Sequence, residues 1–125
     1  MKSYKASVLF VVFLGVLSLG ACAQTESRAT IAWRWVRERK ALLIDVRTPQ
    51  EFAEGHLSGA INVPLDTIAE NIQKIVPQKD QPIVLYCRSG NRSGQALSIL
   101  KTLGYTNLHN GGGYQELAAV KPSNR

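Results

Sequence analysis

The residues best suited to chemistry form one short stretch, CRSGNRS, between an apolar run and a helical pattern. Gly90 lets the backbone turn through conformations that other residues avoid. A tight loop of this kind can point several N–H groups inward, and the start of the next helix adds partial positive charge. The stretch therefore predicts a site that stabilises an anion. Its members are Cys87 as the catalytic nucleophile and, around it, Arg88, Ser89, Gly90, Asn91, Arg92 and Ser93.

Cys87 is predicted to be a reactive thiolate. A free thiol titrates near about 8.5, and cations or a helix N-terminus lower that value. Arg88 and Arg92 add full charges to those of the loop dipoles. The alternative is an inert thiol buried in the core, but the polar, glycine-bearing loop argues against it. We therefore expect an accessible, nucleophilic sulfur.

The first 23 residues have the pattern of a secretory signal peptide. Lys2 and Lys5 precede an uncharged apolar run, residues 8–19, which ends in the small residues Gly20-Ala21-Cys22-Ala23. A basic start, a short apolar middle and a small-residue end are typical of such signals. The protein is therefore predicted to be exported to the periplasm, with one working domain over residues 24–125.

Two cleavage sites compete at the end of this signal. Cleavage after Ala23 would follow an Ala-x-Ala pattern, whereas cleavage after Ala21 would follow a bacterial lipobox and leave a lipid on Cys22. An uncleaved membrane anchor is a third possibility.

The number of cysteines supports a reactive Cys87. Exported proteins normally pair their cysteines, yet either cleavage leaves Cys87 without a partner. A single thiol in an oxidising compartment is a liability unless its reactivity is used.

The charge of the chain is moderately basic. It carries 15 Lys and Arg against 9 Asp and Glu, a net charge of +6; loss of Lys2 and Lys5 would leave an excess of four. The densest basic cluster lies on one predicted helix and is interpreted as its solvated face. Its members are Arg34, Arg37, Arg39 and Lys40. No nucleic acid partner is expected, and membrane contact only through a lipid on Cys22.

Strand and helix patterns alternate along the domain. Helices are predicted at 30–40, 48–55, 66–76, 93–103 and 114–120, and strands at 41–46, 60–63, 82–86 and 107–109. This order favours an α/β fold, a small parallel sheet with helices on both faces. Because ligands bind beyond the carboxyl ends of such strands, Cys87 is expected to lie at the functional edge.

Several side chains near that edge are interpreted as structural. Thr48 and Glu51 form a predicted capping box with proline between them, and Asp66 is predicted to cap the third helix. Asp45 and Arg47 are interpreted as an ion pair that holds the fold. The remaining interpretations are a hydrogen-bonding role for His56 within its loop and a turn at Gly111-Gly112-Gly113.

Three motifs together resemble one known family. Cys-Arg-Ser-Gly-x-Arg-Ser at 87–93 resembles the active loop of single-domain rhodaneses, the thiosulfate sulfurtransferases, and residues 43–52 and 55–64 resemble that family's upstream signatures. The segments 93–96, 103–105 and 110–112 are most similar to the small exported rhodaneses of the phage-shock type. The similarity runs from about 41 to 117. Tyr114 stands near the place where the family often has tryptophan, so this segment is the loosest part of the match.

The resemblance implies a rhodanese-like fold and a specific reaction. Cys87 would attack the sulfane sulfur of thiosulfate or a similar donor, form a persulfide and pass the sulfur to cyanide or a thiol. This is covalent catalysis in two half-reactions. The loop N–H groups would hold the persulfide, and Arg88 and Arg92 would attract the dianionic donor. No metal or organic cofactor is implied, and the protein is expected to be a monomer.

Two alternatives stay open. A persulfide carrier or a non-catalytic binding module on the same fold would share the loop, and steady-state turnover would distinguish it from an enzyme. A cysteine-dependent phosphatase or arsenate reductase uses a Cys-x5-Arg loop. Here the arginine, Arg92, comes one position earlier, and Ser93 occupies the sixth place. The shorter ring suits a sulfur atom better than a tetrahedral oxyanion.

Overall fold

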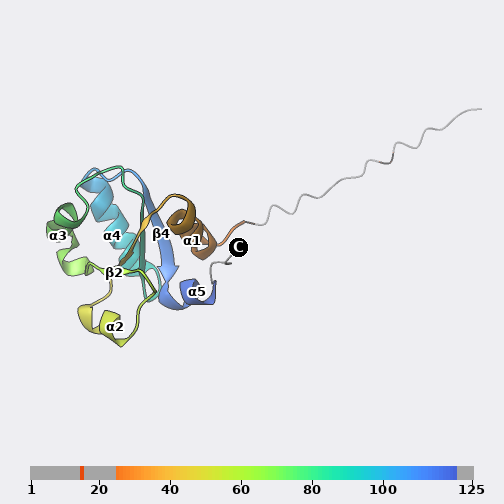
Figure 1. The fold of residues 1–125 in the computed structure, drawn as a ribbon, viewed down its shortest axis with the longest axis horizontal. Helices are drawn as coiled ribbons and strands as arrows, with labels where there is room; N and C mark the ends of the chain where they lie inside the picture. The colour runs from red at the N-terminus through yellow and green to blue at the C-terminus, as the bar shows by residue number, and fades with distance from the viewer. Residues whose placement is uncertain (1–14, 16–24, 121–125) are drawn as a thin grey trace, which may run out of the picture.

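The computed structural model describes Gly15 and residues 25–120. Helices and strands alternate along this range (Figure 1). In chain order the elements are α1 (Arg28–Glu38), β1 (Leu42–Asp45), α2 (Pro49–Glu54), β2 (Ile61–Asn62), the 3-10 turn η1 (Leu65–Thr67), α3 (Ile68–Ile75), β3 (Ile83–Cys87), α4 (Asn91–Thr102), β4 (Leu108–Gly113) and α5 (Tyr114–Ala119).

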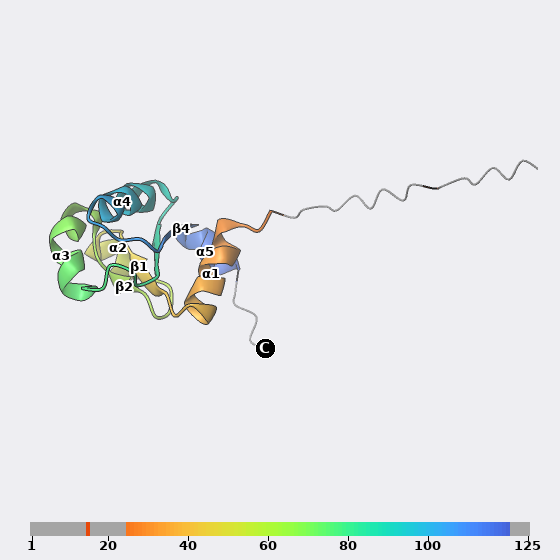
Figure 2. The same cartoon turned by 90° about the horizontal axis from the view of Figure 1, so that it is seen from above.

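The four strands form one parallel sheet in the order β2-β1-β3-β4. Helices α3 and α4 lie on one side of this sheet, and α1 and α5 lie on the other (Figure 2). Helix α2 lies at the end of the sheet towards which β4 points (Figure 1). The predicted fold class, a small parallel sheet with helices on both faces, is confirmed.

The sheet separates two apolar cores, because successive side chains of a strand point to opposite faces. Ile83 and Leu85 of β3 pack under α3 and α4. Val84 and Tyr86, which alternate with them, pack under α1 and α5. All five residues of β3 are buried, so the strand that carries Cys87 is fixed from both sides.

The start of α2 follows the predicted capping chemistry. The Thr48 hydroxyl accepts a hydrogen bond from the Glu51 N–H at 3.2 Å, and a Glu51 carboxylate oxygen accepts one from the Thr48 N–H at 3.3 Å. Pro49 takes the first helical position, where no backbone donor is needed. The capping box is confirmed.

Two predicted helix starts are too late. Helix α1 begins at Arg28 rather than residue 30, because the Ser27 side chain accepts from the Thr30 N–H. Helix α4 begins at Asn91 rather than Ser93. Gly90 takes the cap position with a φ of 96°, which a residue with a side chain rarely adopts. Part of the predicted loop is therefore the first turn of a helix.

Two further interpretations are wrong. Asp66 lies inside η1, and α3 starts after Thr67 without a side-chain cap. The glycine run forms the end of β4 instead of a turn, and Gly112 and Gly113 align with Tyr86 and Cys87. A side chain at Gly113 would collide with the Arg88 carbonyl. Glycine is needed there because two backbones approach closely.

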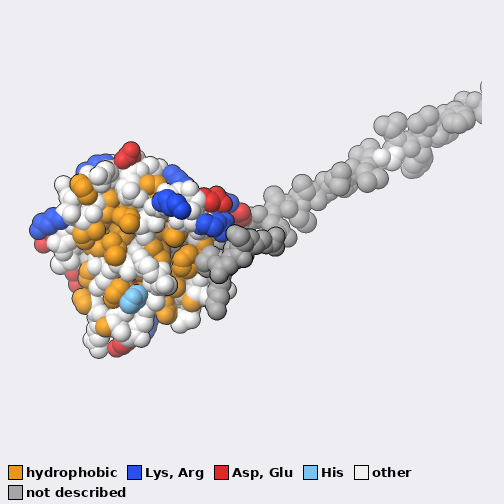
Figure 3. Space-filling view, in the orientation of Figure 1, with side chains coloured by type: hydrophobic (Ala, Val, Ile, Leu, Met, Phe, Trp, Pro, Cys, Tyr) orange, Lys and Arg blue, Asp and Glu red, His pale blue; other side chains and the backbone are white. Residues whose placement is uncertain are grey.

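The basic cluster of the first helix is exposed at Arg37, Arg39 and Lys40 and half-buried at Arg34. Arg34 pairs with Glu26 and Arg37 with Glu38, while the Arg39 guanidinium stacks on Trp35. On the visible face, lysine and arginine side chains lie mainly along the upper rim, several of them close together at the upper right with acidic side chains beside them (Figure 3). Within residues 25–120, no helix combines the length and apolar character needed to cross a bilayer. The predicted signal peptide lies outside the described residues.

Candidate active site

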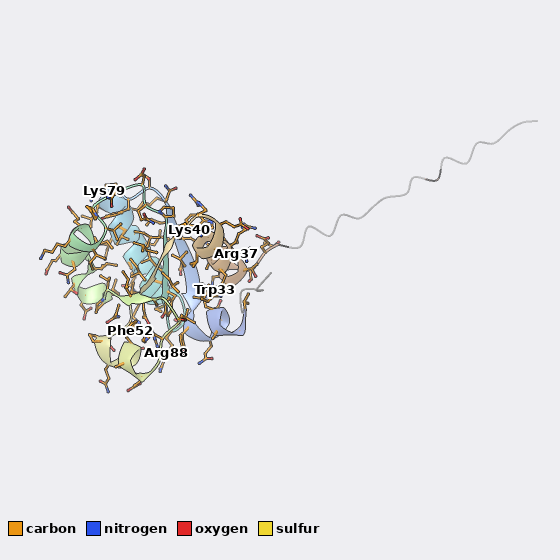
Figure 4. All side chains as sticks on the ribbon, in the orientation of Figure 1. Trp33, Arg37, Lys40, Phe52, Lys79 and Arg88 are labelled. Carbon is orange, nitrogen blue, oxygen red and sulfur yellow. The ribbon has the colours of Figure 1, made fainter. Side chains whose placement is uncertain are left out.

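The predicted loop lies at the carboxyl end of β3. Arg88 is at the same end of the molecule as Phe52 of α2, while Lys79 lies at the opposite end (Figure 4). Helix α5 closes this end from the other side (Figure 1). The loop between β3 and α4 is thus placed where parallel α/β sheets bind their ligands.

The Cys87 sulfur lies inside this loop. The Gly90 N–H donates to Cys87 Sγ at 3.0 Å, and the Ser93 hydroxyl oxygen lies 3.5 Å from the sulfur. Cys87 has an exposed fraction of 0%, so the expectation of an accessible thiol is wrong. The first turn of α4 starts two residues earlier than predicted and folds over the sulfur. Cys87 belongs to the buried apolar cluster under α3 and α4, but the atoms that contact its sulfur from the loop side are polar, as they would not be around an inert core thiol.

The loop lowers the pKa of the Cys87 thiol. Burial alone raises this pKa, because it disfavours the charged form. The Ser93, Ser89 and Gly90 amides act in the opposite direction, as does the Ser93 hydroxyl when its one hydrogen points to the sulfur rather than to Asn110, and together they outweigh burial. The Gly90 amide is therefore an inward-facing N–H group of the predicted kind, and the loop as a whole favours a thiolate.

One side chain from β4 organises the loop from behind. Asn110 Oδ1 accepts from the Ser93 hydroxyl at 2.8 Å and from the Gly112 N–H at 3.0 Å. Its amide nitrogen donates to the Gly90 carbonyl at 3.0 Å. Asn110 thus fixes both residues that contact the sulfur, and it fixes the Ser93 rotamer.

A cleft of about 220 Å³ opens beside the loop. Among the predicted residues, only Arg88 lines it; the other lining residues are Arg47, Glu51, Glu54, Gly55, Tyr114 and Gln115. Arg88 is exposed and makes no ion pair with the described residues. It is the cation best placed to meet a dissolved anion.

Arg92 and Asn91 lie differently from Arg88. Arg92 makes two hydrogen bonds to the Glu51 carboxylate, at 2.6 and 3.0 Å. It lines a separate hollow of about 40 Å³. Asn91 is exposed and accepts from Gln95 within α4. The structure therefore gathers Cys87, Ser89, Gly90 and Ser93 around the sulfur and places Arg88 at the cleft.

The predicted Asp45–Arg47 ion pair is confirmed, whereas His56 bonds helix α2 rather than its own loop. Arg47 Nη2 donates to buried Asp45 at 2.6 Å and to the Gly55 carbonyl at 2.7 Å. His56 Nδ1 bonds the Phe52 carbonyl at 2.9 Å, and the two rings stack. The Arg47 guanidinium also lies 4.7 Å from the Tyr114 ring centre, so this ion pair supports one wall of the cleft.

Three residues at the site were absent from the sequence prediction: Arg28, Asn110 and Glu116. Arg28 comes from α1 and donates to the Ser89 carbonyl at 3.1 Å. It is held by Glu116 of α5 at 2.5 Å. No local pattern marks Arg28, because it stands 61 positions before the residue it contacts.

Known proteins share this fold and are similar in sequence. The rhodanese-like domain family matches residues 28–119. The thiosulfate sulfurtransferase PspE of Escherichia coli is 44% identical over 78 residues, 62% of this chain and 75% of that protein. A sulfurtransferase of Allochromatium vinosum is 37% identical over 81 residues, 65% of this chain and 74% of that protein.

Solved structures agree with these relatives. An E. coli rhodanese described with anions gives a TM-score of 0.60 at 42% identity and covers 62% of this chain and 92% of that one. The human single-domain sulfurtransferase TSTD1 gives a TM-score of 0.65 at 27% identity. The match covers 80% of this chain and 99% of the human one. Fold and site define an α/β protein with a cysteine in an anion-stabilising loop. The chain belongs to the rhodanese family.

Proposed function

We propose that this protein is a rhodanese-type sulfurtransferase that carries sulfur as a Cys87 persulfide. The observation that carries the proposal is the Cys87 sulfur itself, which accepts the Gly90 N–H at 3.0 Å at the end of β3. Relatives named thiosulfate sulfurtransferase support the activity class. They favour sulfur transfer over the phosphatase alternative, which needs a longer loop.

The proposed reaction has two half-reactions. The Cys87 thiolate attacks the outer sulfur of thiosulfate, a Cys–S bond forms, the donor's S–S bond breaks, and sulfite leaves with the bonding electron pair. The persulfide anion then gives its outer sulfur to cyanide or to a thiolate, and the Cys87 thiolate is regenerated. Charge stays on sulfur throughout, so the loop N–H groups stabilise both enzyme forms.

The donor is proposed to be a small sulfur-containing anion such as thiosulfate. Arg88 is exposed at the cleft, and its charge would draw a dianion towards the loop. The similarity to an E. coli rhodanese described with anions supports this assignment. Because Cys87 has no exposed surface, the donor must displace covering side chains before it reaches the sulfur. Arg88, exposed at the edge of the cleft, lies on the route that the donor would take.

Cys87→Ser tests the proposal directly. Serine keeps the size and the hydrogen bond but removes the nucleophilic sulfur, so thiosulfate:cyanide turnover should fall about a thousandfold or more. Intact mass after thiosulfate treatment should show one added sulfur atom on the unmodified protein and none on the variant. An unchanged melting temperature would exclude unfolding as the cause. Turnover retained by Cys87→Ser would contradict the proposed role.

The same experiment separates an enzyme from a persulfide carrier. A carrier would gain the sulfur in the mass measurement and yet release no sulfite beyond one equivalent. An enzyme would continue to release sulfite as long as cyanide or thiol is present. The expected result is continued release, with ping-pong kinetics.

A further inference from the structure

An arginine outside the predicted site lies against the Cys87 loop. Arg28, the first residue of α1, donates from Nη2 to the Ser89 carbonyl at 3.1 Å. Its guanidinium also donates to both oxygens of the Glu116 carboxylate, at 2.9 and 2.5 Å. The backbone at this position is held as well, because His109 Nε2 bonds the Arg28 carbonyl at 2.8 Å.

The carbonyl that Arg28 contacts belongs to a functional peptide group. Ser89 O and Gly90 N are the two ends of one planar peptide unit. Arg28 binds the oxygen end, and the N–H end donates to Cys87 Sγ at 3.0 Å. A charge-assisted bond to the carbonyl both fixes the plane and polarises the N–H. The guanidinium therefore acts on the sulfur through this one peptide.

Two glycines make room for the guanidinium. A side chain at Gly90 would put its first carbon 2.7 Å from Arg28 Nη1, and one at Gly112 would overlap Arg28 Nε. Both glycines have positive φ, 96° and 95°, so a side chain is disfavoured there for two reasons. The loop and β4 thus leave a slot that the Arg28 guanidinium fills.

We propose that Arg28 is a positioning residue for the proposed reaction: held by Glu116, it orients and polarises the Ser89–Gly90 peptide whose N–H binds the Cys87 sulfur. The inference rests on the proposed use of Cys87 as the nucleophile. The Cys87 charge also helps to raise the pKa of Arg28, after the hydrogen bond and the charge of Glu116, which places the two groups within electrostatic reach. Both effects stabilise the thiolate and the persulfide anion that would follow it.

Other charged groups face the same sulfur and need to be held constant in a test. Arg92 of α4 interacts with the Cys87 charge and is paired with Glu51 of α2. Glu116 of α5 lies on the far side of the Arg28 guanidinium. Both arginines are therefore partly neutralised, and the bond to the Ser89 carbonyl is what distinguishes Arg28.

The test compares Arg28→Gln with Arg34→Gln in the full chain, in a Cys22→Ser background so that Cys87 is the only thiol. Arg34 is a matched control, because it lies on the same helix and has a similar ion pair. The side chains of Arg34 and Glu26 are 40% and 46% exposed, and those of Arg28 and Glu116 are 42% and 46% exposed. The measurement is the rate of Cys87 alkylation by iodoacetamide as a function of pH. Arg28→Gln should move the midpoint up by about half a unit to one unit, or about three- to tenfold less thiolate below the midpoint.

The outcomes separate a positioning role from a general charge effect. Arg34→Gln should leave the midpoint in place. Equal shifts in the two variants, or no shift in folded Arg28→Gln, would overturn the proposal. If Arg28→Gln fails to fold, Arg28→Lys decides, because lysine keeps the charge but lacks the planar fork that holds both Glu116 oxygens and the Ser89 carbonyl at once. It should shift the midpoint upward, and a folded variant without a shift would overturn the proposal equally.

This readout is independent of sulfur transfer. Alkylation reports the ionisation of the thiol whether or not the protein turns over thiosulfate. Failure of the proposed function would appear as turnover in Cys87→Ser, whereas failure of the Arg28 role would appear as an unmoved midpoint.

Discussion

At the scale of single residues, short-range dipoles contribute more to the ionisation of Cys87 than whole charges do. The amides of Ser89, Gly90 and Ser93 and the Ser93 hydroxyl all favour the thiolate. The nearby arginines, Arg28 and Arg92, each carry a glutamate partner. Among the described residues Arg88 makes no ion pair, which is why the donor is proposed to meet this arginine first.

Arg88→Ala should therefore weaken the capture of thiosulfate. We expect KM to rise about tenfold, because one charge-assisted contact to a dianion is lost at an exposed site. Part of the effect is steering, so it should shrink as the ionic strength rises. Steady-state kinetics at low and high salt would measure both.

Arg37→Ala is the control for Arg88→Ala. Arg37 lies on α1, away from the loop (Figure 4), and pairs only with its neighbour Glu38 among the described residues. Its replacement makes the same change in net charge and should leave KM nearly unchanged. Equal KM values for both variants would show that Arg88 does not meet the donor.

Which residues the sequence could predict depends on how far apart along the chain the contacts lie. Cys87, Gly90 and Ser93 were predicted because one turn of backbone brings them together. Asn110 and Arg28 reach the loop across 17 or more positions, from β4 and α1. Their contacts depend on strand order and helix placement, which no local pattern specifies.

At the scale of elements, one carboxylate joins two helix starts. Glu51 completes the capping box of α2 and binds Arg92 in the first turn of α4. The hydrogen bond from Arg92 is the main reason that the pKa of Glu51 is lowered to about 2. Helix α2, with no fully buried residue of its own, is thus fixed beside the active-site loop.

Glu51→Gln should measure how much the ion pair between Glu51 and Arg92 stabilises the fold. Glutamine can still complete a capping box, so the substitution removes mainly the charge. A carboxylate whose pKa is depressed in the folded state stabilises it above its unfolded pKa and loses that effect as the pH falls. The variant should lose about 1 kcal/mol of unfolding free energy near neutral pH, given partial exposure. Denaturant titrations at several pH values would show the difference fading between about pH 4.5 and 2.

Glu54→Gln is the matched control on the same helix. Glu54 is exposed and makes no ion pair within residues 25–120. The Glu54→Gln substitution should change the unfolding free energy by less than about 0.5 kcal/mol. A stability gap for Glu51→Gln that persists unchanged at pH 2 would mean that shape rather than charge joins the two helices.

Strands and helices could be predicted from the sequence where burial of apolar side chains determines their positions. The apolar runs of β1 and β3 matched buried central strands, and the α2 cap matched its local signature. The glycine run at the end of β4 predicts a turn from sequence alone, since glycine is depleted in strands in general, whereas the structure continues the strand. Here Gly111 packs against Val84 and Ala32, where any side chain would crowd its neighbours. Tertiary packing therefore outweighs the local preference.

At the scale of the whole molecule, α1 is the first element that the structure describes, and it is part of the folded core. Ser27 caps this helix, Ala29 and Ala32 are buried in the second core, and the family match starts at residue 28. Both proposed cleavage points, after Ala21 and after Ala23, precede these residues. Removal of the leader would therefore leave the core and the Arg28 contact to the active-site loop intact.

We expect the mature protein to be found in the periplasmic fraction with a shortened N-terminus, and intact mass distinguishes the two forms. Cleavage after Ala23 gives a soluble chain that starts at Gln24, whereas lipobox processing gives a membrane-bound chain with a lipid on Cys22. Cys22→Ser should block the second route, because the lipid needs the thiol, and should leave the first unaffected. Cys87→Ser is the paired control, since its cysteine lies in the folded domain and should not alter processing by either route. Recovery of the full 125-residue mass from a washed membrane fraction would contradict both routes and support an uncleaved anchor.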